Sequence, residues 1–357
     1  DLLRRDETLY ENQKFYACIL DEAQAIKNHT TQKYKAVCGV NSKVRFALTG
    51  TPVENRLGEL WSIFSFLMPG YLPPYKSFCA RFEKPIVQED DKAAARRLNQ
   101  LTGPFLLRRM KADVLKELPP KTENIHRIEL EEEQRKLYLA AVVDARDKLQ
   151  AAKPEDKMAV FAVLMRLREI CCDPRLIVDN WEGGSAKLDA CIELVASAVE
   201  GGHRILLFSQ FTSMLELLAK RLDEEGISHF TLQGSTPKPV RAELVRRFNG
   251  GEVSVFLISL RAGGTGLNLT AADIVIHYDP WWNVAAQNQA TDRAYRIGQR
   301  NPVQVYKLIA QDTIEEKIVE LQQAKQSLAD TVTGTADGAI LSMRPDELLQ
   351  LLEGSET

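Results

Sequence analysis

The sequence predicts an α/β fold in which parallel sheets are covered by helices. Short apolar runs rich in β-branched residues recur between residues 205 and 309, and they alternate with longer segments of helical spacing. The links between these segments are short, which is typical of a parallel sheet with helices on both of its faces. The chain has 357 residues, enough for two domains of ordinary size.

The bulk composition is that of a soluble globular protein, with 45% hydrophobic and 27% charged residues. Its formal net charge of −3 provides no global basic field, so any nucleic-acid binding must use local patches. No apolar run reaches the roughly 18 to 20 residues of a membrane span, so we expect no membrane partner. The six cysteines form no CxxC pair, which disfavours a zinc knuckle and indicates reduced thiols of a cytoplasmic protein.

Two strand-like runs near the start of the chain each lead into polar residues. Phe15–Leu20 is followed by Asp21 and Glu22, and Val44–Leu48 is followed by the hydroxyl-rich turn Thr49–Pro52. Acidic residues at the carboxyl end of a parallel strand lie where open sheets bind ligands. Two such carboxylates suit a site that holds Mg²⁺ and an attacking water. For the pair alone, a solvated turn is the favoured interpretation.

Helices dominate the middle of the chain. Residues 131–177 carry two helical patterns with a break at 153–156, and we assign no chemistry to them. Shorter helices are expected at 57–70 and near 91–101. The remaining expected helices are 187–200, 215–225, 239–249 and 312–331 with a short one in the tail, and the remaining expected strands are 205–209, 227–232, 253–259, 274–278 and 303–309.

The stretch from Val255 to Gln299 combines glycine turns with regularly spaced arginines. A glycine-rich turn follows its first strand, and the sequence Asp-Pro-Trp-Trp follows its second. The segment 284–296 lacks proline and glycine and predicts a helix, on which Gln289, Arg293 and Arg296 would share one face. Two guanidinium groups beside glycine turns suit a polyanion such as a nucleotide phosphate. For a bare RxxR, a surface helix with solvated charges is the favoured interpretation.

The motifs DEAQAIKN, TGTP, FSQF, AGGTGLNL, DPWWN and QATDRAYRIGQ occur in this order. Together they resemble the motifs of the Swi/Snf-type ATPases, which are double-stranded-DNA translocases of the helicase-like superfamily two. One difference is Val284, where the family usually has proline after WWN. The resemblance implies two RecA-like lobes that bind ATP between them, with ATP and Mg²⁺ as cofactors, double-stranded DNA as partner, and a DNA-bound protein as the object displaced or remodelled.

The resemblance also implies roles for individual residues. Asp21 would hold Mg²⁺ through water, and Glu22 would polarise the hydrolytic water. Arg293 and Arg296 would act as arginine fingers, with Gln289 beside them in the catalytic group. The expected nucleotide-binding residues further include Gly264 and Gly266, and the expected DNA-binding residues are Thr51, Ser209, Gln210, Arg241, Ser259, Arg261 and Trp282. The short hydroxyls and spaced arginines suit contacts with the phosphate backbone, which are independent of sequence.

A phosphate-binding loop of the form GxxxxGK[ST] is missing, because the sequence contains no Gly-Lys dipeptide. In the resembling family this loop lies upstream of the DEAQ motif. We therefore expect a fragment that does not hydrolyse ATP by itself. The expected parts are the end of the first lobe with a helical insertion (1–118), a linker and helical protrusion (119–183), the second lobe (184–312), a brace helix (313–331) and a tail helix (332–357).

Two alternative functions remain. One is a strand-separating DNA or RNA helicase of the same superfamily, against which DPWWN and RIGQ argue. The other is a non-catalytic DNA-binding module, which the missing loop would literally imply. The cellular location would be the cytoplasm, at the nucleoid in a prokaryote, or the nucleus in a eukaryote.

Overall fold

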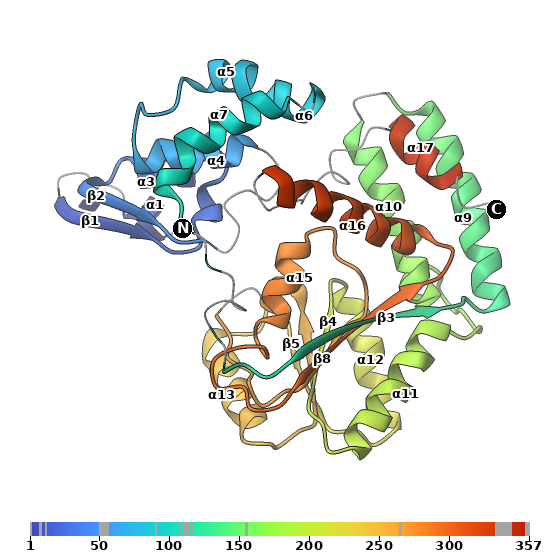
Figure 1. Cartoon of the computed structure of the whole chain (residues 1–357). Coiled ribbons are helices and arrows are strands. Elements are labelled where there is room, and N and C mark those ends of the chain that lie inside the picture. Colours follow the sequence, from blue (N-terminus) through green and yellow to red (C-terminus); the bar gives the residue numbers. More distant parts are fainter. Residues whose placement is uncertain are drawn as a thin grey trace. The chain divides into compact units, whose positions relative to one another are not determined.

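The structure is a computed structural model that describes most of the chain. Backbone is described for residues 2–6, 9–10, 13–49, 57–89, 91–107, 109, 115, 117–153, 156–263, 266–332 and 345–353. The chain divides into two compact units (Figure 1), residues 1–109 with 322–339 and residues 110–321 with 340–357. Each unit is described by itself.

The first unit is built on a parallel pair of strands, β1 (Lys14–Leu20) and β2 (Asn41–Ala47). Arg45 of β2 ties the pair to the helices, because its guanidinium donates to the carbonyls of Val40 at 2.9 Å and Phe66 at 2.8 Å. The helical segments of this unit are α1 (Leu2–Arg5), η1 (Ala23–Ile26), α3 (Gln32–Cys38), α4 (Leu57–Leu67), α5 (Tyr75–Phe78), the π-helical η2 (Cys79–Glu83), α6 (Lys84–Glu89), α7 (Lys92–Thr102) and η3 (Gly103–Phe105).

The core of the first unit lies among its helices rather than over its strands. Leu60 and Phe64 of α4 pack with Phe78 and with Leu98 of α7, and all four are at most 2% exposed. On the strand pair, Ile19 and Phe46 are register partners but are 61% and 52% exposed. Apolar sheet surface thus remains uncovered within the described residues of this unit.

The second unit contains a six-stranded, fully parallel sheet with the strand order β3-β8-β7-β4-β6-β5. In this order β5 and β6 lie on one side of β4, and β7 and β8 lie on the other. The chain therefore changes its direction of travel across the sheet at β4, and the connecting helices cover both faces. The strands are β3 (Lys121–Ile128), β4 (Ile205–Ser209), β5 (His229–Leu232), β6 (Val255–Ser259), β7 (Ile274–His277) and β8 (Val303–Ala310). The helices around them are α11 (Ala186–Glu200), α12 (Thr212–Glu224), α13 (Lys238–Asn249), the short α14 (Leu260–Gly263) and α15 (Val284–Thr291).

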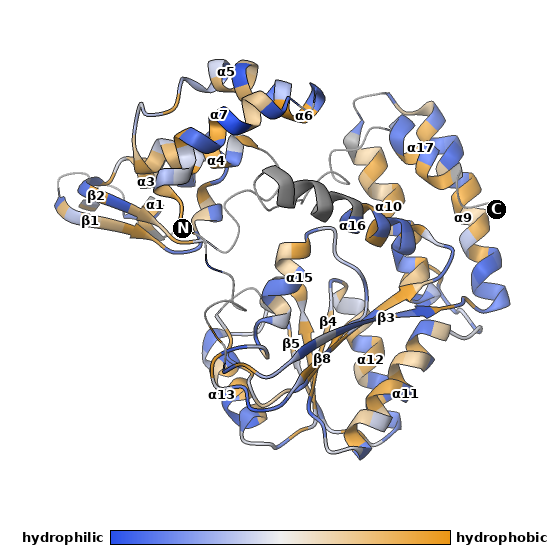
Figure 2. Ribbon diagram, viewed as in Figure 1, coloured by the Kyte–Doolittle hydropathy of each residue, from blue (hydrophilic) through white to orange (hydrophobic). Residues whose placement is uncertain are grey.

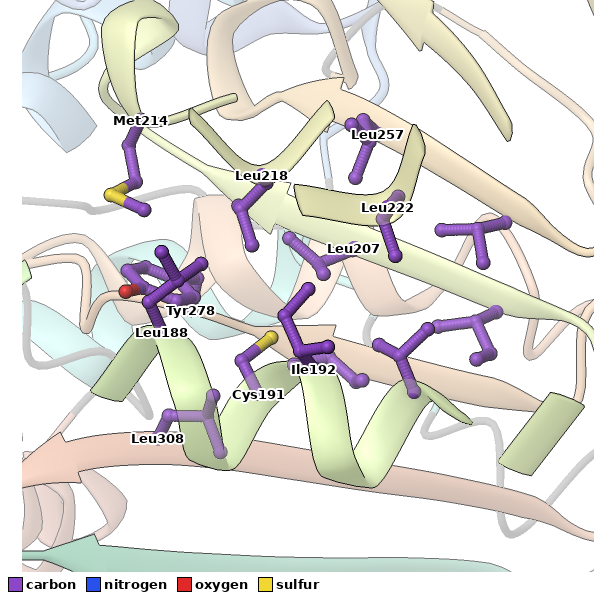
Figure 3. Close-up of a cluster of buried hydrophobic side chains, with 14 of the residues drawn as sticks. Leu188, Cys191, Ile192, Leu207, Met214, Leu218, Leu222, Leu257, Tyr278 and Leu308 are labelled. Atoms are coloured by element: carbon purple, nitrogen blue, oxygen red, sulfur yellow. The ribbon is translucent and has the colours of Figure 1, made fainter. Parts of the chain in front are cut away.

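Alternate residues of the strands point to opposite faces of this sheet, and each face carries its own hydrophobic core. On one face, Leu207 of β4 and Leu257 of β6 meet Ile192 of α11 and Leu218 of α12 (Figure 3). On the other face, Phe256 of β6 is buried with residues that include Phe248 of α13 and Ala290 of α15. The central strands β4 and β6 are therefore buried on both faces, as their continuous apolar sequences predict.

A helical hairpin belongs to the second unit. It consists of α9 (Glu132–Ala151) and α10 (Lys157–Cys172), followed by η4 (Pro174–Leu176). The C-terminal helix α17 (Pro345–Glu353) packs on α9, and the start of α16 (Ile314–Val332) contributes Ile314 and Ile318 to the same core. Within the described part of the chain, no helix is long and apolar enough to cross a membrane.

The structure corrects two sequence-based expectations. β3 pairs along β8 in a region expected to hold a linker and helices. Its sequence KTENIHRI contains no apolar run, and Figure 2 shows much of it as hydrophilic. Only Ile128 of the strand is buried. The helix expected over 284–296 ends at Thr291, and residues 292–298 form turns. All six cysteines are free thiols, as expected.

Candidate functional site

In the first unit, two acidic residues follow the carboxyl end of β1. Asp21 and Glu22 are both exposed, and the Glu22 N–H donates to Asp21 Oδ1 at 2.9 Å. Glu22 has φ 50° and ψ 52°, a left-handed conformation that is uncommon for a residue with a side chain. Mg²⁺ is usually held by one or two carboxylates and keeps several waters, so two accessible carboxylates at a strand end fit such an ion.

Hydrogen bonds join the ends of β1 and β2. The Leu48 N–H donates to the Leu20 carbonyl at 2.7 Å. Beyond it, the Thr49 hydroxyl donates to Gln24 Oε1 at 2.7 Å, and Gln24 Nε2 donates to Glu22 Oε2 at 2.6 Å. The orientation of the Glu22 carboxylate therefore depends on a residue after the neighbouring strand. The sequence indicates this role of Gln24 only through its place in the DEAQ motif. Thr51 lies outside the described residues.

In the second unit, a buried carboxylate holds the ends of the adjacent strands β4 and β7 together. Asp279, two residues beyond β7, is 0% exposed and accepts hydrogen bonds from the Ser209 hydroxyl at 2.6 Å and the Gln210 N–H at 3.2 Å. Its charge partner is Arg168 of α10, whose Nη2 lies 3.3 Å from Oδ2. Burial raises the pKa of Asp279, while Arg168 and the Ser209 hydroxyl oppose the rise.

Three of the expected DNA-contacting side chains are interior. Ser209, Ser259 and Trp282 are 0%, 3% and 6% exposed. The Ser209 hydroxyl is bonded to Asp279, and the Trp282 ring packs against Arg168, whose Cζ lies 4.1 Å from the ring centroid. These three side chains are buried in the second unit, and their contact with DNA stays a prediction. Arg168 is not among the expected site residues, because the helical pattern around it carries no motif of the site.

The other expected DNA-contacting residues lie closer to the surface. Gln210 is half-buried at the end of β4. Arg241 of α13 is half-buried, and its guanidinium donates to the carbonyls of Thr236 and Gly234 at 2.8 Å each. Arg241 thereby braces the loop that precedes its own helix. The backbone of Arg261 lies in α14, and its side chain is outside the description.

The two arginines of the RAYR segment do not share a helical face, which corrects the expectation for Gln289, Arg293 and Arg296. Because α15 ends at Thr291, both arginines lie in the following turns. Arg293 is 7% exposed, and its carbonyl accepts from the Leu269 N–H at 3.0 Å. Arg296 is exposed. Gly266 has φ +47° in the preceding loop, a conformation that suits glycine, and Gly264 lies outside the described residues.

Gln299 holds these turns in place. Its Nε2 donates to the carbonyls of Ala272 at 2.7 Å and Ala294 at 3.1 Å, with a longer bond to Thr270 at 3.2 Å. Its Oε1 accepts from the N–H groups of the two residues that follow it, Arg300 and Asn301. One buried amide therefore fixes the segment that carries both arginines to the loop after Gly266. Gln299 was not among the expected site residues, although it ends the RIGQ motif.

Comparisons with known proteins agree with these motifs. Residues 1–176 match the model of the SNF2-related domain, and residues 186–298 match the helicase conserved C-terminal domain. The chain is 39% identical to an "Uncharacterized ATP-dependent helicase" of Mycoplasma pneumoniae over 99% of its own length and 34% of the relative. It is 41% identical to the "Putative ATP-dependent helicase/translocase YwqA" of Bacillus subtilis over 95% of its length and 38% of the relative. The chain thus spans about a third of the length of these two relatives.

A solved structure of a related protein resembles this chain over nearly its whole length. The Sulfolobus solfataricus SWI2/SNF2 ATPase core in complex with double-stranded DNA is 34% identical, with a TM-score of 0.57. The likeness covers 98% of this chain and 75% of that one. These findings confirm the expected α/β fold of RecA-like parallel sheets. The chain belongs to the Swi/Snf family of helicase-like proteins.

Proposed function

We propose that the chain is the motor part of a longer, ATP-dependent translocase that moves along double-stranded DNA. The observation that carries the proposal is the hydrogen-bonded path from Glu22 through Gln24 to Thr49. This path links a carboxylate suited to activating water with the turn after the neighbouring strand. A change at either strand end is thereby transmitted to the other, which is what coupling hydrolysis to movement requires.

Glu22 and Asp21 have different proposed roles at the end of β1. Both carboxylates are exposed, so Asp21 can accept a hydrogen bond from metal-bound water, and Glu22 can orient an attacking water. When bound, Mg²⁺ neutralises negative charge that develops on the transferred phosphate. The two carboxylates have different hydrogen-bond partners, since Asp21 accepts from the Glu22 N–H and Glu22 accepts from Gln24 Nε2.

Arg296 and Arg293 are the proposed arginine fingers. Arg296 presents an exposed side chain, whereas Arg293 is 7% exposed and tied through its carbonyl to Leu269. We therefore assign the larger direct effect on hydrolysis to Arg296. Arginine fingers contribute on the order of 10³ to 10⁵ to the rate in related phosphoryl transfer. Gln289, Gly264 and Gly266 complete the proposed nucleotide site.

The proposed DNA surface is the edge of the second unit where β4, β6 and β7 end. Gln210 lies at this edge, and α12 begins beside it without a side-chain cap. Unpaired N–H groups at a helix start attract phosphate. Arg241 and Arg261 add positive charge after β5 and β6. Thr51 lies outside the described residues, and its DNA contact stays a prediction. Such contacts bind the backbone of any sequence. A DNA-bound protein would be displaced by the movement.

Two alternatives make different predictions. A strand-separating helicase would unwind a long forked duplex with ATP, whereas the proposed translocase would hydrolyse ATP on intact duplex DNA without unwinding it. A non-catalytic module would bind DNA and hydrolyse nothing. The deciding experiment measures phosphate release and unwinding in parallel for the longer protein. We expect release to be stimulated by blunt duplex DNA, with Gln210→Ala and Arg261→Ala lowering the stimulated rate more than the basal rate. Robust unwinding would overturn the translocase proposal.

A further inference from the structure

An arginine of the helical hairpin lies in the protein interior. Arg168 of α10 is 0% exposed and is among the largest fully buried side chains of the described residues. Its Nη2 donates to Asp279 Oδ2 at 3.3 Å and to the carbonyl of Pro280. Removing a guanidinium and a carboxylate from water costs several kcal/mol per ion, and apolar replacements of such pairs are often no less stable. Stability alone therefore does not account for this pair.

Arg168 has aromatic as well as polar neighbours around its guanidinium. The ring centroid of Trp282 is 4.1 Å from Cζ and that of Phe211 is 5.7 Å away. Two of its nitrogens, Nε and Nη1, have no hydrogen-bond partner within the described part of the protein. Cation–π contacts with the two rings thus supplement its polar bonds. A lysine, which lacks the planar fork, would not reproduce this arrangement.

The pair connects three segments that are far apart in sequence. Asp279 joins the residues after β7 to the loop after β4, through the Ser209 hydroxyl and the Gln210 N–H. Arg168 adds the hairpin to this junction and contacts aromatic rings from both segments. The backbone of Gln210 is therefore held by a carboxylate whose charge is balanced by Arg168.

We propose that Arg168 is a positioning residue that holds the loop 209–211 against the segment 279–282 and so shapes the edge that contacts DNA phosphates. The inference rests on the proposed function, because it assumes that this edge binds duplex DNA. It assigns the hairpin a role in DNA binding without direct contact. If Arg168 is removed, the loop is no longer fixed and the edge loses phosphate contacts, although the fold remains.

The test measures duplex-DNA binding by the 357-residue chain over a range of salt concentrations, with the active fraction fixed by stoichiometric titration. For duplex DNA, the slope of log K against log salt changes by about 0.9 for each phosphate contact. We expect Arg168→Met to weaken binding several-fold and to reduce this slope by about 0.9. Arg168→Lys should recover the thermal midpoint more than it recovers the slope.

A double variant separates positioning from stability. Arg168→Met with Asp279→Asn removes both buried charges, and the introduced amide oxygen would still accept from the Ser209 hydroxyl. We expect the double variant to regain thermal stability relative to Arg168→Met while its salt slope stays low. The matched control is Arg175→Met, because Arg175 pairs with buried Asp173 at 2.7 Å outside the two loops. This control should change stability but not the slope.

The outcomes distinguish this inference from the proposed function. An unchanged slope in Arg168→Met, or full recovery of both stability and slope in the double variant, overturns the positioning role while the DNA-binding proposal stands. Absence of duplex binding by the unaltered chain overturns the proposed DNA surface of the second unit and this inference with it, whereas the proposed function is tested separately on the longer protein. A reduced slope in Arg168→Met and in the double variant, with an unchanged slope in Arg175→Met, establishes the positioning role.

Discussion

The hydroxyl of Thr49 donates a 2.7 Å hydrogen bond to Oε1 of Gln24, which joins the residue two places after β2 to the turn after β1. Gln24 in turn holds Glu22 through its amide nitrogen. An amide side chain is well suited to this relay, because it accepts on one atom and donates on the other. The carboxylate proposed to orient water is thus connected to the turn that carries TGTP.

Replacing Thr49 by valine should disconnect this relay in the longer protein. Valine has a similar shape but no hydroxyl, so Gln24 loses its donor and Glu22 is less firmly oriented. A neutral hydrogen bond contributes about 1 kcal/mol, so we expect kcat for ATP to fall about fivefold with little change in KM. Steady-state kinetics provide the measurement. Thr30→Val is the control, because the Thr30 hydroxyl donates to Asn28 in another loop. Equal effects of the two changes would contradict the relay.

Glu22→Gln should preserve ATP binding while hydrolysis collapses. Glutamine keeps the size of the side chain and one acceptor oxygen, but it cannot take a proton from water. A positioned general base contributes about 10² to 10⁴ in rate, so kcat should fall by that factor. Nucleotide affinity from equilibrium titration and single-turnover hydrolysis give the two readouts. A loss of affinity with an intact turnover number would refute the assigned role.

Gln299→Glu should loosen the turns that carry Arg293 and Arg296. The new carboxylate cannot donate to the carbonyls of Ala272 and Ala294, so buried acceptors lose their partner, at a cost of about 1 to 3 kcal/mol in the free energy of unfolding. Amide hydrogen exchange across residues 292–301 should accelerate selectively.

The control for this change is Gln304→Glu, since Oε1 of Gln304 accepts from the Tyr306 hydroxyl and an acceptor would remain. If exchange across 292–301 were equally slow in Gln299→Glu and in the unaltered chain, the bracing role of Gln299 would be wrong.

His277 should make the second unit less stable in mild acid. It lies on β7 with 1% exposure, and burial lowers its pKa from 6.5 to about 3, with Lys307 acting in the same direction. The unfolded state therefore binds a proton below pH 6.5 that the folded state excludes. Its contribution is complete above pH 6.5 and is lost as the pH falls towards 3, by about 2 kcal/mol between pH 8 and pH 5.

Slow-exchanging amides of β7, followed between pH 8 and pH 5, would measure this effect. His277→Gln should flatten the pH dependence, whereas His126→Gln, at an exposed position of β3, should not. Identical pH profiles for all three proteins would show that His277 is protonated without cost in the folded state.

How much the sequence predicts depends on whether local patterns decide the structure. The central strands β4, β6 and β7 were predicted because each is a continuous apolar run that only a covered sheet can bury. The sequence does not indicate β3, because this strand lies at the edge of the sheet and needs few apolar residues. Its pairing with β8 is set by tertiary contacts. The end of α15 at Thr291 was missed for a similar reason. Residues 292–296 have no helix breaker, but the Arg293 carbonyl bonds to Leu269 instead of continuing the helix.

The same reasoning applies to the candidate site. Asp21, Glu22 and the arginines of the RAYR segment stand out by residue type and motif, so the sequence indicates them. Arg168 and Gln299 each bond to a residue more than 20 positions away in sequence, and no local pattern reveals these bonds. Ser209 and Trp282 show the opposite case, since the motifs indicate them but both side chains are buried in the structure.

The most direct test of the proposed motor measures phosphate release by the longer protein, with and without saturating duplex DNA, for the unaltered sequence and for Arg296→Ala. Arg296 is exposed in the turn after α15 and is assigned to the transferred phosphate. We predict strong stimulation by duplex DNA in the unaltered protein and a loss on the order of 10³ or more in the stimulated rate with Arg296→Ala. No stimulation by duplex DNA, or a stimulated rate that Arg296→Ala leaves intact, would contradict the account.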